Sequence, residues 1–568
     1  RCQYTMFFCN RNIVENISLI TVFIKSFKMN KKYLLILIAV SMLAFGACKK
    51  SKNEPATGDR TELSLDSIFL YAKEIYYWND KLPSYESFNP RKYNTGSTAL
   101  EKYEAELFGI AGYSTNKYDV RKSNGVYQNV PKYSYIEDQD DKNPKLSVRD
   151  LSSVDTDGNG NDVGIRFGLF GNTSSYKIFV SAVYDNSPAK AAGFVRGDLI
   201  TKINGVSYVT NYPGDAAINA VLGASTLKLE GERVDGTRFD ITLTKTLFKS
   251  KHIYKTQVLT AGSKKIGYLA YARFGALSTP PTLTTAAGDV ELDAAFTQFA
   301  NAGVTDLIID FRYNGGGYVY AAEHLTNLIA PSSVRGTMFT EYYNSTMQSG
   351  NAKILSNQPL LDAAGNIRYS SSGKMLTYAN VDYAPSANIT SFAKKGSLNS
   401  VANIVFLVTG NTASASELVI NSLRPHVNVK IVGQTTYGKP IGFFPITIEN
   451  KYDVWLSLFV TKNSLGQGGD YFDGLVPDVQ VASELSNVTI NNVPKTNVMF
   501  DFGNPNDAFL KTALNLLAPG VTVNGQLSSP IVTKEVSSIS APATTLGSGS
   551  FGTTEFKGMI ETRFKLKN

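Results

Sequence analysis

Apolar and polar residues follow three different patterns along the chain. From 61 to 115 the apolar positions recur with helical spacing, and Pro83 ends the first helical pattern. From 163 to 245 the apolar runs are short and alternate with polar residues, which is typical of strands. From 250 onward strand-like and helix-like segments alternate, which predicts an α/β core. The predicted fold class is multidomain α/β.

These changes of pattern predict the boundaries of the domains. A chain of 568 residues with 43% hydrophobic and 18% charged residues is globular and too long for one core. The predicted parts are an upstream segment with a signal peptide at 1–47, a tether at 48–60, a helical N-terminal domain at 61–150, a β domain at 151–248, an α/β core at 249–490, and a C-terminal helix with a Ser/Thr/Gly-rich tail at 491–568.

Two strand–turn–helix repeats in the α/β core carry the candidate chemistry. "VTDLIIDFRYNGGG" predicts a buried strand that enters a glycine turn, and "ANIVFLVTG" predicts a second strand that leads into "NTASASELVI" at 411–420. Open α/β sheets place ligands and nucleophiles at such carboxyl ends of strands. Ser414 is therefore the candidate nucleophile, with small alanines beside it, and we expect Ser416 to cap the following helix.

A serine nucleophile needs a base. The three histidines, His252, His324 and His426, lie in no segment typical of a catalytic triad. Lys439 in "TYGKPIGFF" is the alternative, although a single lysine is more often a solvated surface charge. Free lysine titrates about three units above pH 7, so a lysine base requires an enclosed, apolar site.

These segments resemble the C-terminal processing peptidases, also called tail-specific proteases, which use a serine–lysine dyad. "TASASELVINSL" and "IVGQTTYGKPIGF" match the family pattern, and Lys439 follows Ser414 at the family spacing of 25 residues. "DFRYNGGG" at 310–317 resembles the family's oxyanion-hole turn, and "DGLVPDVQV" resembles its closing segment. The resemblance implies that Lys439 activates Ser414, and that the amide of Ala415 and one from Gly316 or Gly317 hold the oxyanion.

Two positions depart from the family pattern. Phe443 stands where the family commonly has a glutamine that orients the lysine, and Gly315 replaces a proline of the glycine turn. Three functions therefore stay open. They are an endopeptidase that cuts exported proteins or peptides near a free C-terminus, a catalytically inactive relative that binds peptides, and a structural or carrier protein for an apolar ligand.

The stretch "DNSPAKAAGFVRGDLITKINGVSY" at 185–208 resembles a PDZ domain of bacterial proteases. "VGIRFG" then falls at the carboxylate-binding loop of such a domain. The resemblance implies that the backbone amides of four consecutive residues hold a peptide C-terminus while the peptide adds a strand. These residues are Gly164, Ile165, Arg166 and Phe167. The alternative is a packing module that binds no peptide.

The segment "DTDGNGNDVGIR" at 155–166 matches the first half of a calcium-binding loop. Its twelfth position, which requires a bidentate carboxylate, is Arg166. We therefore interpret the segment as a turn, and we expect neither a metal nor a cofactor.

The N-terminal region predicts export. From Met29, a lysine pair, an apolar run from Tyr33 to Phe45 and small residues lead to Cys48. The ending "FGAC" resembles a bacterial lipobox, which implies a lipid anchor on Cys48 in the bacterial cell envelope, facing the periplasm or the cell surface. Ordinary signal cleavage is the alternative. The body after Cys48 contains no cysteine, and the helical segment 61–115 resembles that of lipoprotein members from Bacteroidetes-like bacteria.

The net charge does not indicate a nucleic-acid partner. The formal charge is +8, but residues 1–47 carry +5 of it, which leaves +3 on the rest of the chain. The expected partners are protein or peptide substrates and a membrane, and the oligomeric state stays open.

Overall fold

The computed structural model describes residues 57–123, 125–139, 154–281, 286–362, 365–490, 493–523, 526–527, 545–546 and 558–567. The predicted signal peptide, Cys48 and the tether up to residue 56 lie outside these ranges. The described helices and strands belong to one compact unit, Asp59–Asn568. Among the described helices, none combines the length and the apolar character that crossing a bilayer requires.

Two capped helices open the described chain. Helix α3 (Arg60–Ile75) begins at Asp59, whose carboxylate accepts the Glu62 N–H at 2.9 Å. Helix α5 (Ala99–Ala111) begins in the same way at Thr98. Their apolar faces share one hydrophobic cluster with strands β20 (Ile441–Phe443), β21 (Ile446–Ile448), β22 (Tyr452–Trp455), β23 (Phe459–Asn463) and β16 (Thr337–Tyr343). The helices therefore pack directly on the part of the chain that carries Phe443.

The predicted β domain forms a sheet with its own core. Its strands follow the order β10-β9-β7-β6-β5-β29. The bounds are β5 Ile165–Asn172, β6 Tyr176–Val183, β7 Leu199–Ile203, β9 Thr226–Glu232, β10 Arg238–Thr244 and β29 Thr545–Leu546, with helices α6 Pro188–Ala191 and α7 Asp215–Leu222. A separate hydrophobic cluster fills this domain.

The α/β core is built on an eight-stranded sheet in the order β24-β19-β18-β14-β13-β12-β27-β28. Its strands are β12 Ile253–Ala261, β13 Lys264–Tyr271, β14 Asp306–Asp310, β18 Asn403–Val408, β19 Asn428–Gly433, β24 Val479–Gln480, β27 Thr522–Val523 and β28 Gln526–Leu527. Strands β13, β14, β18 and β19 run parallel. Parallel strands need helical crossovers, and this requirement accounts for the helices on both faces.

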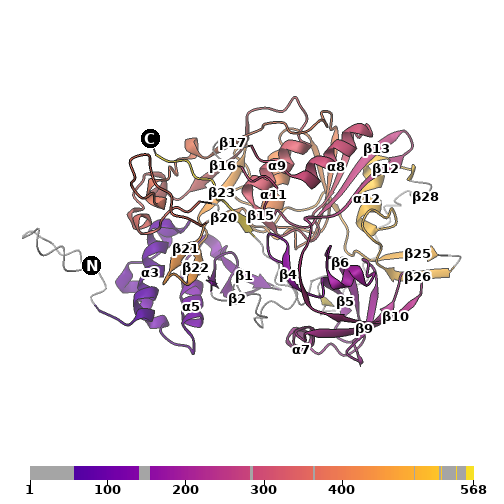
Figure 1. The fold of residues 1–568 in the computed structure, drawn as a ribbon, viewed down its shortest axis with the longest axis horizontal. Coiled ribbons are helices and arrows are strands. Elements are labelled where there is room, and N and C mark those ends of the chain that lie inside the picture. The colour runs from indigo at the N-terminus through magenta and orange to yellow at the C-terminus, as the bar shows by residue number, and fades with distance from the viewer. Residues whose placement is uncertain are drawn as a thin grey trace, which may run out of the picture. The chain divides into compact units, whose positions relative to one another are not determined.

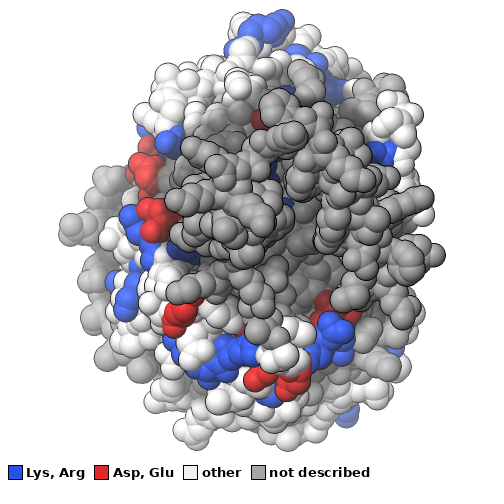
Figure 2. Space-filling model, turned by 90° about the vertical axis from the view of Figure 1, so that its left-hand side faces the viewer, with Lys and Arg blue, Asp and Glu red and all other residues white. Residues whose placement is uncertain are grey.

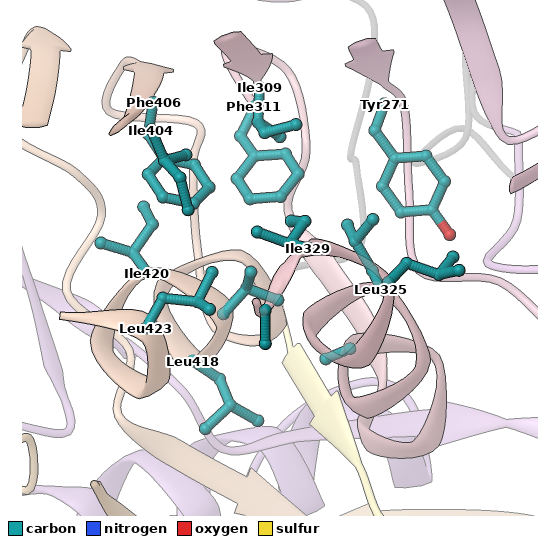
Figure 3. Packing of buried hydrophobic residues seen from close by; sticks show 14 of the residues in the cluster. Tyr271, Ile309, Phe311, Leu325, Ile329, Ile404, Phe406, Leu418, Ile420 and Leu423 are labelled. Carbon is teal, nitrogen blue, oxygen red and sulfur yellow. The ribbon is translucent and has the colours of Figure 1, made fainter. Parts of the chain in front are cut away.

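Alternate residues of the central strands face opposite layers. Ile309 and Phe406 share a hydrophobic cluster with helices α8 (Val290–Asn301), α9 (Val319–Ile329) and α11 (Ala415–Leu423), and Figure 3 shows both strands above the helices that carry Leu325 and Ile420. Ile308, Val405 and Leu407 instead join the cluster of helix α12 (Ala508–Leu517). The sheet is thus buried on both faces.

A second sheet lies beside the first and has the order β15-β30-β20-β23-β16-β17 (Figure 1). Strand β15 spans Gly316–Tyr318, β17 spans Ile389–Ser391, and β30, from the end of the chain, spans Gly558–Ile560. The remaining elements are small: α4 Tyr85–Phe88, α10 Ser345–Gln348, β1 Val120–Ser123, β2 Val126–Pro131, β3 Tyr135–Asp138, β4 Asn159–Asp162, β8 Val206–Ser207, β11 Thr246–Lys249, β25 Ser486–Ile490 and β26 Val493–Val498. On the face in Figure 2, lysine and arginine side chains of the described surface lie beside aspartate and glutamate side chains.

Candidate active site

Ser414 lies on a strained turn between strand β18 and helix α11. Its φ of 59° is unusual for a residue other than glycine, and such strain is typical of a nucleophile at a strand-to-helix turn. The side chain is fully buried, and its Oγ has no hydrogen-bond partner in the described part of the chain. No described acceptor takes the Ala415 N–H either. The Ser414 hydroxyl and the Ala415 amide therefore make no hydrogen bond within the described structure.

The prediction that Ser416 caps helix α11 is wrong. Ser414 occupies the N-cap position, and Ser416 lies in the first turn, where its Oγ donates to the carbonyl of Asn314 at 3.0 Å. The same carbonyl accepts the Ala413 N–H at 3.1 Å. The helix begins two residues earlier than expected because the turn, and not a serine side chain, sets its start. The hydrogen bond of Ser416 therefore joins the turn at Ser414 to the glycine turn.

Glu417 joins the two halves of the predicted dyad. One carboxylate oxygen accepts the N–H of Ser414 at 2.7 Å and that of Lys439 at 2.8 Å. The other accepts the Gly438 N–H at 2.8 Å and the Thr436 hydroxyl. Burial raises the pKa of this carboxyl, while these four donors oppose the rise. The backbone at Ser414 and the backbone at Lys439 are thus held on a single oxygen atom.

Lys439 lies in an aromatic enclosure, as a lysine base requires. The side chain is 1% exposed, and its Nζ lies 4.1 Å from the centre of the Phe443 ring and 5.6 Å from that of Tyr133. Tyr133 also donates its hydroxyl to the carbonyl of Gly438 at 2.5 Å. Local sequence patterns carry no signal for Tyr133, because it reaches the lysine from about 300 residues upstream. Phe443, which stands in place of the family's glutamine, therefore contacts Lys439 through the face of its ring and offers the lysine no hydrogen bond.

The glycine turn lies next to the candidate nucleophile, Ser414. Gly316 and Gly317 have φ values of +113° and +138°, which side-chain-bearing residues rarely adopt. The Gly316 N–H donates to the side chain of Asn314 at 2.9 Å, and Gly317 belongs to the ladder with β30. A methyl group on Gly316 would lie 3.1 Å from both the Ala415 nitrogen and the Ser414 Cβ. The structure thus brings Ala415 and Gly316 together, with the Ala415 amide free to meet an oxyanion.

We predict that Gly316→Ala lowers kcat by about 100-fold, the loss typical for a disturbed oxyanion hole. The new methyl would also lie 2.4 Å from the Gly558 carbonyl oxygen, so the turn must shift. Gly303→Ala is the matched control, because Gly303 has φ +70° with open space around it and shares only the backbone strain. Steady-state kinetics of both variants measures the difference. Equal losses of kcat in Gly316→Ala and Gly303→Ala would contradict the prediction that a methyl group next to the Ala415 amide disturbs the oxyanion hole.

A buried network of ion pairs lies directly before the glycine turn. Arg312 pairs with Asp310 at 2.6 Å and with Asp507 at 2.9 Å, and Arg196 of the β domain pairs with Glu484 at 2.8 Å. Burial raises the pKa of Asp507, but the two guanidinium groups outweigh it and hold this pKa below its ordinary value. Paired charges of this kind fix geometry, because removal of one partner leaves another charge buried alone.

The predicted carboxylate-binding loop of the β domain also contacts this turn. The Arg166 guanidinium lies 3.9 Å from the centre of the Tyr313 ring, and Ile165 and Phe167 are buried in the domain core. The Gly164 N–H donates to Asp162 at 3.0 Å. Ile165, Arg166 and Phe167 therefore lie in strand β5, paired with β6, and this end of the strand packs against the glycine turn.

One further sequence expectation has a clear outcome. Asp155 accepts the N–H groups of Asp157 at 2.9 Å and Asn159 at 2.8 Å, so the segment that resembles a calcium-binding loop forms a turn, as predicted.

A cavity opens beside the glycine turn, between the β domain and the core. Its lining residues are Val154, Asp155, Thr156, Tyr184, Tyr254, Ala272, Arg273, Tyr313, Gly315 and Gly316.

Comparison with known proteins identifies the two domains. Residues 265–481 match the model of peptidase family S41, and residues 179–221 match that of the PDZ domain. A putative S41 protease from Bacteroides fragilis has the same fold, with a TM-score of 0.50, 22% identity, and coverage of 79% of this chain and 96% of that one. The chain thus has a multidomain α/β fold with N-terminal helices, in which one segment is similar to S41 peptidases and another to PDZ domains.

The similar curated proteins are C-terminal processing peptidases. The chloroplastic enzyme of Tetradesmus obliquus is 24% identical over 325 residues, which cover 55% of this chain and 58% of that protein. The carboxyl-terminal-processing protease of Synechocystis is 23% identical over 380 residues, which cover 66% and 73%. The chain thus spans little more than half the length of the algal relative.

Proposed function

We propose that the protein is an exported serine endopeptidase that cleaves proteins or peptides near their C-termini through Ser414 and Lys439. The observation that carries this proposal is the Glu417 carboxylate, which holds the backbones of both residues on one oxygen. The family matches and the fold support the same proposal.

The reaction is acyl transfer. Neutral Lys439 takes the proton of the Ser414 hydroxyl, and the serine oxygen attacks the peptide carbonyl carbon. The Ala415 N–H stabilises the oxyanion, a contribution of about 3 kcal/mol for one donor. Lys439 then gives its proton to the leaving amine, which departs and leaves an acyl-enzyme. Lys439 then takes a proton from a water molecule, whose oxygen attacks the ester carbonyl. Lys439 returns that proton to the departing Ser414 oxygen, which releases the carboxylate product and leaves the lysine neutral again.

Phe443 favours one alternative, a peptide-binding relative without catalysis. The lysine ammonium at 4.1 Å from the centre of the Phe443 ring has the geometry of a cation–π contact, which stabilises the charged form. A protonated lysine cannot act as the base. Cleavage assays of Ser414 and Lys439 variants separate the two functions.

The PDZ domain is proposed to engage the substrate C-terminus. We predict that amidation of a peptide substrate's C-terminus raises KM about tenfold, because a charge-assisted hydrogen bond to the carboxylate is lost. N-terminal acetylation of the same peptide is the control and should leave KM unchanged. An amidated peptide that is cleaved with an unaltered KM would contradict C-terminal recognition.

A lipid on Cys48 is proposed to anchor the enzyme in the bacterial envelope, facing the periplasm. The support is the lysine pair, the apolar run and the small residues before this cysteine. We predict that an alkyne-tagged fatty acid labels the parent in bacterial cells, and that Cys48→Ala removes the label. Labelling that persists in Cys48→Ala would place the lipid elsewhere, and an unlabelled parent would favour ordinary signal cleavage.

A further inference from the structure

The end of the chain runs through the catalytic sheet. Strand β30 lies between β15, which follows the glycine turn, and β20, which follows Lys439, and it is parallel to both (Figure 1). The Gly558 N–H donates to the carbonyl of Gly315 at 3.1 Å, and the Glu561 N–H donates to that of Phe443 at 3.2 Å. The two loops of the proposed dyad site are therefore bridged by residues more than one hundred positions further along the chain.

An ion-pair cluster fixes the residues that follow this strand. Arg563 pairs with Glu561 at 3.1 Å and with Glu323 of helix α9, the helix that leaves the glycine turn. The Glu341 carboxyl is buried beside Glu561, and burial together with Glu561 raises its pKa well above the ordinary value. A protonated Glu341 can lie beside a carboxylate without repulsion. The cluster thus ties the end of the chain to the same turn that β30 contacts.

Apolar packing also anchors this end of the chain. Met559 is fully buried in the main core cluster. The Phe564 ring lies 5.4 Å from that of Phe444 and 5.2 Å from that of Tyr378. The Lys567 N–H donates to the carbonyl of Asn380 at 2.9 Å. Displacement of this segment would expose Met559 and more of the Phe564 ring to water, although the side chains of Lys565 and Lys567 are already exposed.

We propose that residues 558–563 are a positioning element of the catalytic site, with Arg563 as its principal side chain. Strand β30 sets the distance between the glycine turn and the Lys439 loop, and the Arg563–Glu323 pair sets the start of helix α9. This inference rests on the proposed peptidase function. It excludes the opposite role, in which the same segment blocks the site and must leave before a substrate binds.

The test compares two variants of the full chain with a matched control. Gly558→Pro removes the N–H that bonds Gly315, and Arg563→Ala removes the ion pairs, while Lys565→Ala alters an exposed cation just after this element. We expect kcat to fall about 100-fold in Gly558→Pro and about tenfold in Arg563→Ala, with KM within about twofold, because small displacements of reacting groups have such costs. Arg563→Lys should recover part of the loss, and Lys565→Ala should match the parent.

Hydrogen exchange separates failure of this inference from failure of the peptidase function. Peptides that cover 311–320 and 436–444 should exchange faster in Gly558→Pro and Arg563→Ala than in the parent, whether or not the parent cleaves. Unchanged exchange in both variants would overturn the inference. Faster cleavage by either variant would also overturn it, and would identify the segment as an inhibitor. If Gly558→Pro does not fold, Arg563→Ala and Arg563→Lys carry the same comparison.

Discussion

Ser414→Ala and Lys439→Ala should each abolish cleavage of an unfolded protein substrate, with a fall in kcat of roughly 10⁴-fold or more. The first variant removes the nucleophile and the second removes the base that activates it. Because the two residues act as a unit, the double variant should be no slower than either single variant. Quantified cleavage over time measures all three.

Two controls make this result specific. Lys439→Arg keeps a cation in the same enclosure but cannot act as a base, so it should be as inactive as Lys439→Ala. Lys430→Ala removes a half-exposed lysine that pairs with Asp478 and should retain parental activity. Thermal unfolding of each variant checks the fold. An Lys439→Arg variant that cleaves at a parental rate would contradict lysine as the base.

Glu417→Gln should lower kcat about 100-fold and destabilise the fold by about 3 kcal/mol. The amide has one acceptor oxygen, so part of the buried N–H set of Ser414, Gly438 and Lys439 would lose its partner. Both dyad residues would then lose their common support. Kinetics and denaturant unfolding measure the two effects. Glu291→Gln is the control, because Glu291 is partly exposed and pairs with a lysine at the surface.

The pH profile tests Glu417 independently. Burial raises the pKa of its carboxyl above the ordinary value of 4.5, so protonation begins at a higher pH than for an exposed glutamate. A protonated carboxyl accepts fewer hydrogen bonds, and kcat/KM should therefore fall on the acid side at a pH above 4.5. In Glu417→Gln the part of this fall that comes from Glu417 should disappear, while the fall caused by protonation of the base Lys439 should remain. A profile that is identical in parent and variant would assign the acid limb to another group.

The sequence predicted those parts of the fold that depend on local pattern. The alternation of strands and helices after 250 indicated the α/β core, and the strand–turn–helix at 403–423 placed Ser414 correctly at its turn. The role of Glu417 was missed, although it belongs to the same motif. Its signal was a glutamate in the first turn of a helix between two segments of the α/β core, where a buried carboxylate needs partners.

Other parts of the site carried no local signal. Tyr133 and strand β30 reach the dyad region from distant parts of the chain, and only tertiary packing brings them there. The Ser416 prediction was wrong for a related reason. Its small polar side chain suits a cap, but its hydroxyl bonds Asn314 from another loop. Propensity identified the type of residue and not its partner.

Covalent capture of the nucleophile tests the central claim most directly. The full chain would be treated with a fluorophosphonate probe, and the adduct would be located by peptide mapping in the parent and in Lys439→Ala. A single adduct on Ser414 in the parent, at least about tenfold slower in Lys439→Ala, is the predicted result. An adduct on Ser416, or no adduct in a parent that still binds peptides, would contradict the dyad and leave a peptide-binding protein.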